Sequence, residues 1–152
     1  QVFLRHFNEK LCNRSFDVRK KMKNYDLEDV GDYDVLVYNP GKNIWIMVEC
    51  KFNQTPFCMK EMKRLREEIF ATEKPSHITK IMKRYEFIKQ YHQKFAKFFG
   101  YPVTSDESPI IKTLYVAKSI NWVHRGYSMD SNIEFVQLDN LDYWIRDNLL
   151  EK

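Results

Sequence analysis

The sequence has little of the residues that build irregular or cross-linked proteins. Its 152 residues include only 4 Gly and 5 Pro, which excludes collagen, glycine-rich linkers and most all-turn scaffolds. The 3 Cys are an odd number without CxxC spacing, so neither a disulfide framework nor a zinc site is expected. Apolar runs are too short to span a bilayer, and no signal-peptide pattern opens the chain. We therefore expect an intracellular protein, in the cytoplasm or nucleoid, that does not contact a membrane.

What the sequence does contain is apolar and aromatic material for a core. Hydrophobic residues make up 43% and aromatic residues 15% of the chain, and this length can bury a core without cross-links. We expect residues 1–152 to form a single domain. Because the chain begins at Gln1 rather than Met, we also expect it to be part of a longer protein with further domains.

Basic charge is concentrated in the middle of the chain. The formal net charge is only +4, but residues 60–97 hold eleven basic and five acidic side chains, a local charge of +6. Such a concentration is typical of a surface that faces a polyanion. The alternative is an ordinary solvated helix surface, which this segment alone does not exclude.

Periodicity and turn chemistry predict a mixed order of helices and strands. The Asn39-Pro40-Gly41 sequence predicts a tight turn between two apolar strands. The fold class expected is α/β, a mixed sheet flanked by helices in the order αβββα(α)ββα. The elements expected are a helix over 2–13, strands over 16–22, 33–38 and 44–52, helices over 57–71 and 75–99, strands over 110–117 and 133–138, and a last helix capped by Asp139.

Four charged residues lie at the ends of the strands expected over 33–38 and 44–52. The other residues of these strands are those of a buried core. The charged residues are Asp32, Asp34, Glu49 and Lys51, and such residues are rarely buried unless they are paired. If the hairpin turns about the bond from residue 41 to 42, Asp34 faces Glu49. If residues 40 and 41 are the central turn residues, Asp32 faces Glu49 instead. In either register an aspartate and Glu49 project together, close enough to bind one cation.

Two carboxylates beside a lysine have a recognised chemical use. Mg²⁺ takes hard oxygen ligands and is often held by one or two protein carboxylates. It lowers the pKa of bound water and offsets charge on a phosphate group, while a neighbouring lysine positions the attacking water. The alternative is a cross-strand salt bridge at a sheet edge.

This pattern resembles the active-site signature of the PD-(D/E)xK superfamily, the restriction-endonuclease-like nucleases. The resemblance rests on Asp34, on Glu49-x-Lys51 in the next strand, and on the order of elements over most of the chain. It implies that Asp34 and Glu49 bind a divalent metal and that Lys51 orients the hydrolytic water. The sequence departs from the signature at Tyr33, where the superfamily name has proline.

The resemblance implies further site residues. Members often add an acid on the first helix, for which Glu9 is the candidate, and some have a glutamine shortly after the lysine, for which Gln54 is the candidate. Asp32 is either a second metal ligand or a residue at the start of the strand. Basic residues near the site are candidates for contacts to the nucleic-acid backbone; these are Lys60, Lys63, Arg64, Arg19 and Lys20.

The function predicted is therefore that of a metal-dependent endonuclease, a phosphodiester hydrolase acting on nucleic acid, with DNA preferred over RNA. The cofactor expected is Mg²⁺, with Mn²⁺ able to replace it, and a homodimer is left open. The alternative is a catalytically inactive nucleic-acid-binding module on the same fold. A third interpretation is a protein-interaction domain whose charges form only an edge salt bridge.

Overall fold

A five-stranded mixed sheet forms the centre of the protein in a computed structural model that describes residues 1–101, 108–120, 124 and 133–150. The strands follow each other across the sheet in the order β1-β2-β3-β4-β5. Strand β2 pairs antiparallel with both β1 and β3, whereas β3, β4 and β5 run parallel. The fold is therefore α/β, as the sequence predicts. The strands are β1 (Cys12–Asp17), β2 (Asp32–Asn39), β3 (Ile44–Lys51), β4 (Ile110–Ala117) and β5 (Ile133–Gln137).

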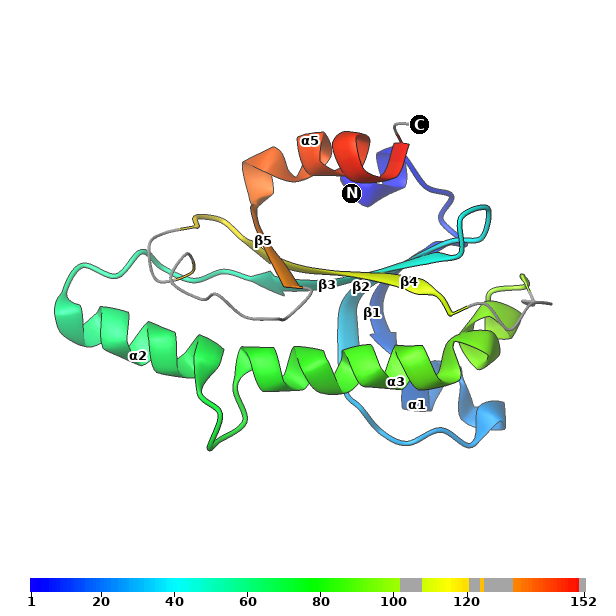
Figure 1. The fold of residues 1–152 in the computed structure, drawn as a ribbon, viewed down its shortest axis with the longest axis horizontal. Helices are drawn as coiled ribbons and strands as arrows, with labels where there is room; N and C mark the ends of the chain where they lie inside the picture. Colours follow the sequence, from blue (N-terminus) through cyan, green and yellow to red (C-terminus); the bar gives the residue numbers. More distant parts are fainter. Residues whose placement is uncertain (102–107, 121–123, 125–132, 151–152) are drawn as a thin grey trace.

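Helices cover both faces of this sheet (Figure 1). The helices α1, α2 and α3 lie on one face, while α5 and the N-terminal segment lie on the other. Among the described residues, no helix has the length and apolar content needed to cross a membrane. The helical elements are η1 (Phe3–Arg5), α1 (Val18–Lys21), η2 (Lys23–Tyr25), α2 (Met59–Phe70), α3 (His77–Phe98), η3 (Leu138–Asn140), α5 (Leu141–Ile145) and the π-helical η4 (Arg146–Leu150).

The long helix α3 begins and ends where its sequence predicts. Ser76 accepts a hydrogen bond from the Thr79 amide, and Thr79 bonds back to the Ser76 amide, which completes a capping box. Gly100 follows the helix with φ +82°, a left-handed conformation that glycine adopts without the steric cost of a side chain. The face of α3 that meets the sheet is the one that carries the buried residues Ile81, Ile88 and Phe95.

The predicted first helix over 2–13 is wrong. Only Phe3–Arg5 is helical, as one short 3₁₀ turn, and Cys12 already belongs to β1. The Asn8 side chain accepts a hydrogen bond from the Lys10 amide, a local turn that competes with helix formation. The apolar spacing is nevertheless used, because Phe3 is buried and Phe7 packs beside it.

Two other boundaries also differ from the predictions. The strand predicted over 16–22 ends at Asp17, and the helix α1 follows it directly. Asp17 stops the strand because its carboxylate accepts a hydrogen bond from the Lys20 amide and so caps α1. At the other end of the chain, α5 is preceded by Asn140 as its N-cap residue, and Asp139 lies inside the short η3.

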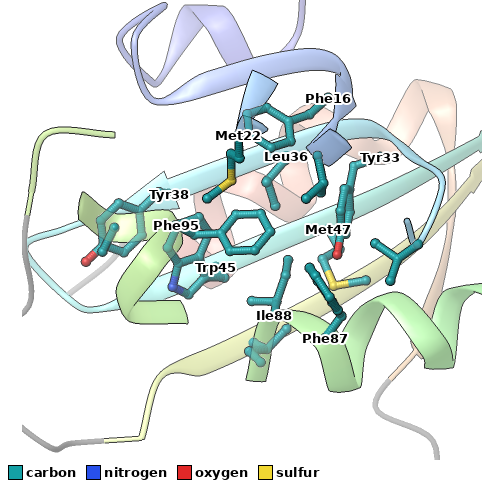
Figure 2. Close-up of a cluster of buried hydrophobic side chains, with 14 residues drawn as sticks. Phe16, Met22, Tyr33, Leu36, Tyr38, Trp45, Met47, Phe87, Ile88 and Phe95 are labelled. Carbon is teal, nitrogen blue, oxygen red and sulfur yellow. The ribbon is translucent and has the colours of Figure 1, made fainter. Parts of the chain in front are cut away.

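The core between α3 and strands β1 to β3 is rich in aromatic rings (Figure 2). Tyr38 and Trp45 stack with ring centroids 4.1 Å apart, and Phe95 of α3 packs edge-on against Trp45. Phe87 is buried in the same cluster. Phe87 and Phe95 are therefore core residues.

Candidate active site at the ends of β2 and β3

The two central strands pair in the first of the two predicted registers. Val35 faces Val48, and every paired number from β2 and β3 sums to 83. Asp34 precedes Val35 in β2, and Glu49 follows Val48 in β3, so these two residues are the next in the same register. The Asp34 carboxylate binds the backbone of β3: its Oδ2 accepts a hydrogen bond from the Cys50 amide at 2.7 Å.

Asp34 lies where the alternation of β2 side chains is interrupted. Tyr33 and Leu36 are three residues apart, so strict alternation would place them on opposite faces. Both nevertheless pack in the core cluster under α3. The neighbouring residue of β1, Ser15, has φ +46°. This local irregularity turns the Asp34 side chain toward the backbone of β3.

Glu49 is a buried carboxylate held by two cations. It is only 6% exposed. Its Oε1 lies 2.7 Å from Lys51 Nζ, and its Oε2 lies 2.6 Å from Arg84 Nη1. The prediction that Glu49 and Lys51 share one face of β3 is therefore confirmed. An uncompensated buried charge costs several kcal/mol, so cationic partners stabilise Glu49 in this position.

Arg84, from α3, is the site residue that the sequence reasoning missed. Its Nε donates to the Val30 carbonyl at 3.4 Å, and its guanidinium lies 5.9 Å from the ring centroid of Tyr33. A Cβ at Gly31 would stand 3.3 Å from Arg84 Nη2, so glycine gives the guanidinium room. The sequence does contain a signal for Arg84: it lies three residues after Ile81 and four before Ile88, within the apolar stripe of α3.

Gln54 lies outside this ion-paired centre but adjoins it. The segment after β3 and the first turns of α2 line a cleft of about 360 Å³. Gln54 and Arg64 both line it and are exposed. Lys60 and Lys63 are exposed on the same helix. Arg64 thus lies beside the candidate site, with Lys60 and Lys63 on the helix that carries it.

Asp32, Arg19 and Lys20 belong to a second cleft, beside α1. Within it, Lys20 pairs with Asp17 at 2.9 Å and Arg19 with Asp29 at 3.8 Å. Asp32 therefore lies with these cations. Within the described part of the chain, Asp32 takes no part in the ion pairs of Glu49 and Lys51. Acidic partners already offset the positive charge of this cleft.

Glu9 is not brought to the site by a helix, because the predicted helix is absent there. It is exposed in the turn that precedes β1. Among residues 1–101, 108–120, 124 and 133–150, no group of three His, Cys, Asp or Glu side chains converges in a way that could hold a metal.

The remaining donors suit a hard divalent cation nonetheless. Asp34 and Glu49 supply carboxylate oxygens at neighbouring strand ends, and the Cys50 carbonyl lies between Glu49 and Lys51 in the chain. Mg²⁺ often uses only one or two protein carboxylates and completes its shell with water and phosphate. Asp34 and Glu49 therefore fit Mg²⁺ by donor type, provided that Glu49 exchanges one of its cationic partners.

A polar network centred on the neighbouring strand β4 includes residues that follow Lys51 in the chain. Tyr115 pairs with Glu49 in the parallel ladder, and its hydroxyl accepts a hydrogen bond from the Asn53 side-chain amide at 3.0 Å. The same hydroxyl lies 3.0 Å from His77 Nδ1, and His77 Nε2 lies 3.4 Å from the Glu68 carboxylate. This network connects the end of β3 to the start of α3.

His77 makes stability depend on pH. Burial, and then the charge of Lys51, hold the pKa of His77 below its ordinary value of 6.5. The unfolded chain therefore binds a proton at a higher pH than the folded one, so the contribution is fully present above pH 6.5 and is lost as the pH falls toward the folded pKa. We expect the free energy of unfolding, measured in urea, to fall below pH 6.5, and His77→Gln to flatten that slope. An unchanged slope in His77→Gln would contradict the assignment to His77.

Comparisons of the chain with family models, with curated protein sequences and with solved structures found no match. The class that the structure itself defines is an α/β domain with a mixed five-stranded sheet.

Proposed function

We propose that this chain is a Mg²⁺-dependent nuclease domain of the restriction-endonuclease-like type, with DNA as the preferred substrate. The observation that carries the proposal is the contact of Lys51 Nζ with the buried Glu49 carboxylate at 2.7 Å, beside Asp34 at the adjoining end of β2. An ordinary edge salt bridge has little reason to bury its carboxylate at the centre of a sheet. The chain order of three strands, two long helices, two strands and a short helix also supports this class.

Each site residue has a role in this reaction. Asp34 and Glu49 would hold the cation, and Arg84 orients the Glu49 carboxylate through its 2.6 Å contact. When bound, Mg²⁺ would lower the pKa of water and offset the charge of the phosphate. The Lys51 ammonium orients a water molecule for in-line attack on phosphorus, and the bond from phosphorus to the 3′-oxygen breaks.

The proposal is tested by a cleavage assay on supercoiled plasmid and on single-stranded DNA. We expect nicking or cutting with Mg²⁺ or Mn²⁺ and none in the presence of a chelator, because the phosphate charge is then not offset. The measurement is the conversion of supercoiled plasmid to open and linear forms on a gel. Cleavage that persists unchanged with the chelator present would contradict the metal requirement.

A non-catalytic nucleic-acid-binding module is the second candidate function. One observation favours it: both oxygens of Glu49 already contact cations, Lys51 and Arg84. DNA binding without cleavage under every metal tested would support this candidate over the nuclease. If DNA affinity is absent, or does not fall with salt as phosphate contacts require, both candidates fail and a protein-interaction domain remains.

A further inference from the structure

The cleft beside the candidate site begins one residue after Lys51. Its wall consists of residues 52–57 together with side chains from the start of α2, including Glu61, Arg64 and Glu68. The cleft is therefore next to Lys51 in the chain, where a nucleotide adjoining a phosphate at Lys51 would find it. The chemistry of the cleft determines which form of nucleic acid fits there.

Two phenylalanine rings in the wall of this cleft face solvent. Phe52 is 76% exposed and Phe57 is 90% exposed. They are the only phenylalanines in the part of the chain that the structure describes to be exposed. The other aromatic side chains near α3 pack in the core. Rings left in solvent beside a candidate site are available for stacking on the faces of bases.

The charges around the rings favour a polyanion. Lys118 Nζ lies 5.4 Å from the ring centroid of Phe52. Arg64 and Lys60, on α2, are exposed and form no ion pair with any residue that the structure describes. These cations are therefore available for phosphate groups.

The acidic side chains of the same cleft already have partners in the protein. Glu61 Oε2 accepts a hydrogen bond from the Phe57 amide at 2.8 Å. The Glu68 carboxylate lies 3.4 Å from His77 Nε2. These contacts offset part of the negative charge of the two carboxylates, although the Glu68 side chain remains 54% exposed.

We propose that Phe52 and Phe57 stack on unpaired bases, so that the nucleic acid bound at this site is single-stranded or locally unwound rather than a continuous duplex. A duplex keeps the faces of its bases stacked on each other, whereas a single strand exposes them to aromatic rings. As a statement about the substrate the inference rests on the nuclease function proposed above. As a statement about binding it stands without cleavage.

The test measures binding by fluorescence anisotropy in the presence of a chelator, so that nothing is cut. The probes are a labelled single strand of about 16 nucleotides, the upper end of a single-strand site size, and the duplex of the same sequence. We expect the single strand to bind more tightly than the duplex. Phe52→Ala and Phe57→Ala should each weaken single-strand binding by about 5- to 150-fold, the equivalent of one lost stacked base, with duplex binding unchanged.

Two control variants make the result specific. Tyr143→Ala removes another exposed aromatic ring, 67% exposed on α5, which lies across the sheet from α2 and α3 (Figure 1), and should change neither affinity. Phe57→Tyr keeps a ring and should keep single-strand affinity, whereas Phe57→Leu keeps an apolar side chain and should lose it. Equal single-strand affinity of Phe57→Leu and wild type would show that the aromatic ring is not required and would overturn the proposal.

The remaining outcomes separate this inference from the proposed nuclease function. Metal-dependent cleavage with equal affinity for both probes, and no effect of the alanine variants, overturns the stacking surface and leaves the nuclease standing. Single-strand binding that depends on both rings, without cleavage under any metal, supports the stacking surface and overturns the nuclease.

Discussion

Lys51→Met is expected to reduce metal-dependent cleavage by about 100-fold or more, the lower bound for losing a group that positions or activates a reacting water. Methionine removes the ammonium but keeps a side chain of similar length. The fold should tolerate the change, because Lys51 is 27% exposed at its side chain and Glu49 still contacts Arg84. The measurement is the single-turnover cleavage rate with enzyme in excess, with thermal melting as the check on folding.

Two further variants sharpen this result. Lys112→Met removes a lysine of the adjacent strand that pairs with Glu134 at 4.0 Å, and it should cleave like wild type. Asp34→Asn keeps an oxygen that can accept the Cys50 amide but loses the charge, so it should require more Mg²⁺ at equal stability. A folded Lys51→Met variant with wild-type cleavage rates contradicts the role given to this lysine.

Arg84→Met is expected to destabilise the folded protein by about 3 kcal/mol, because removing one partner of a buried ion pair leaves a charge uncompensated. Glu49 then keeps only Lys51, and the Val30 carbonyl loses its contact with Arg84 Nε. The free energy of unfolding from urea titrations measures the effect. Arg66→Met, which removes an exposed arginine of α2, serves as the matched control and should change stability by less than about 0.5 kcal/mol.

The double variant Glu49→Leu/Arg84→Met identifies the cause. Replacing both members of a buried pair by apolar side chains is often close to neutral, so the double variant should be more stable than Arg84→Met alone. If the double variant is less stable than the wild type by the sum of the two single-variant effects, the two side chains act independently and the coupling inferred from their 2.6 Å contact is wrong.

The central hairpin was predictable because its signals are local. Strands β2 and β3 each contain a nearly continuous run of apolar residues, and the Pro40-Gly41 sequence between them marks a turn. Two turn positions left only two registers, and both placed an aspartate near Glu49. The pairing of Val35 with Val48 selects one of them.

The first helix could not be predicted by the same reasoning. Phe3 and Phe7 have the spacing of a helix, but the hydrogen bond from the Lys10 amide to Asn8 and the pairing of Cys12 with Val37 favour a turn and a strand instead. Strand pairing with β2 is a long-range interaction, and sequence periodicity contains no information about it. The role of Glu9 as an acid on a first helix rested on that helix and has no helical support here.

The sequence by itself determined the carboxylates and the lysine, the strands on which they lie and the face that Glu49 and Lys51 share, because strand alternation and turn chemistry act over a few residues. Only the tertiary structure decided how the buried charge of Glu49 is compensated and where Asp34 points. Arg84 reaches Glu49 from a helix 35 residues away along the chain, and Asp34 bonds a backbone amide 16 residues away. Such contacts depend on how α3 packs on the sheet and on where the pairing of β2 with β3 ends. No local sequence pattern predicts either of these.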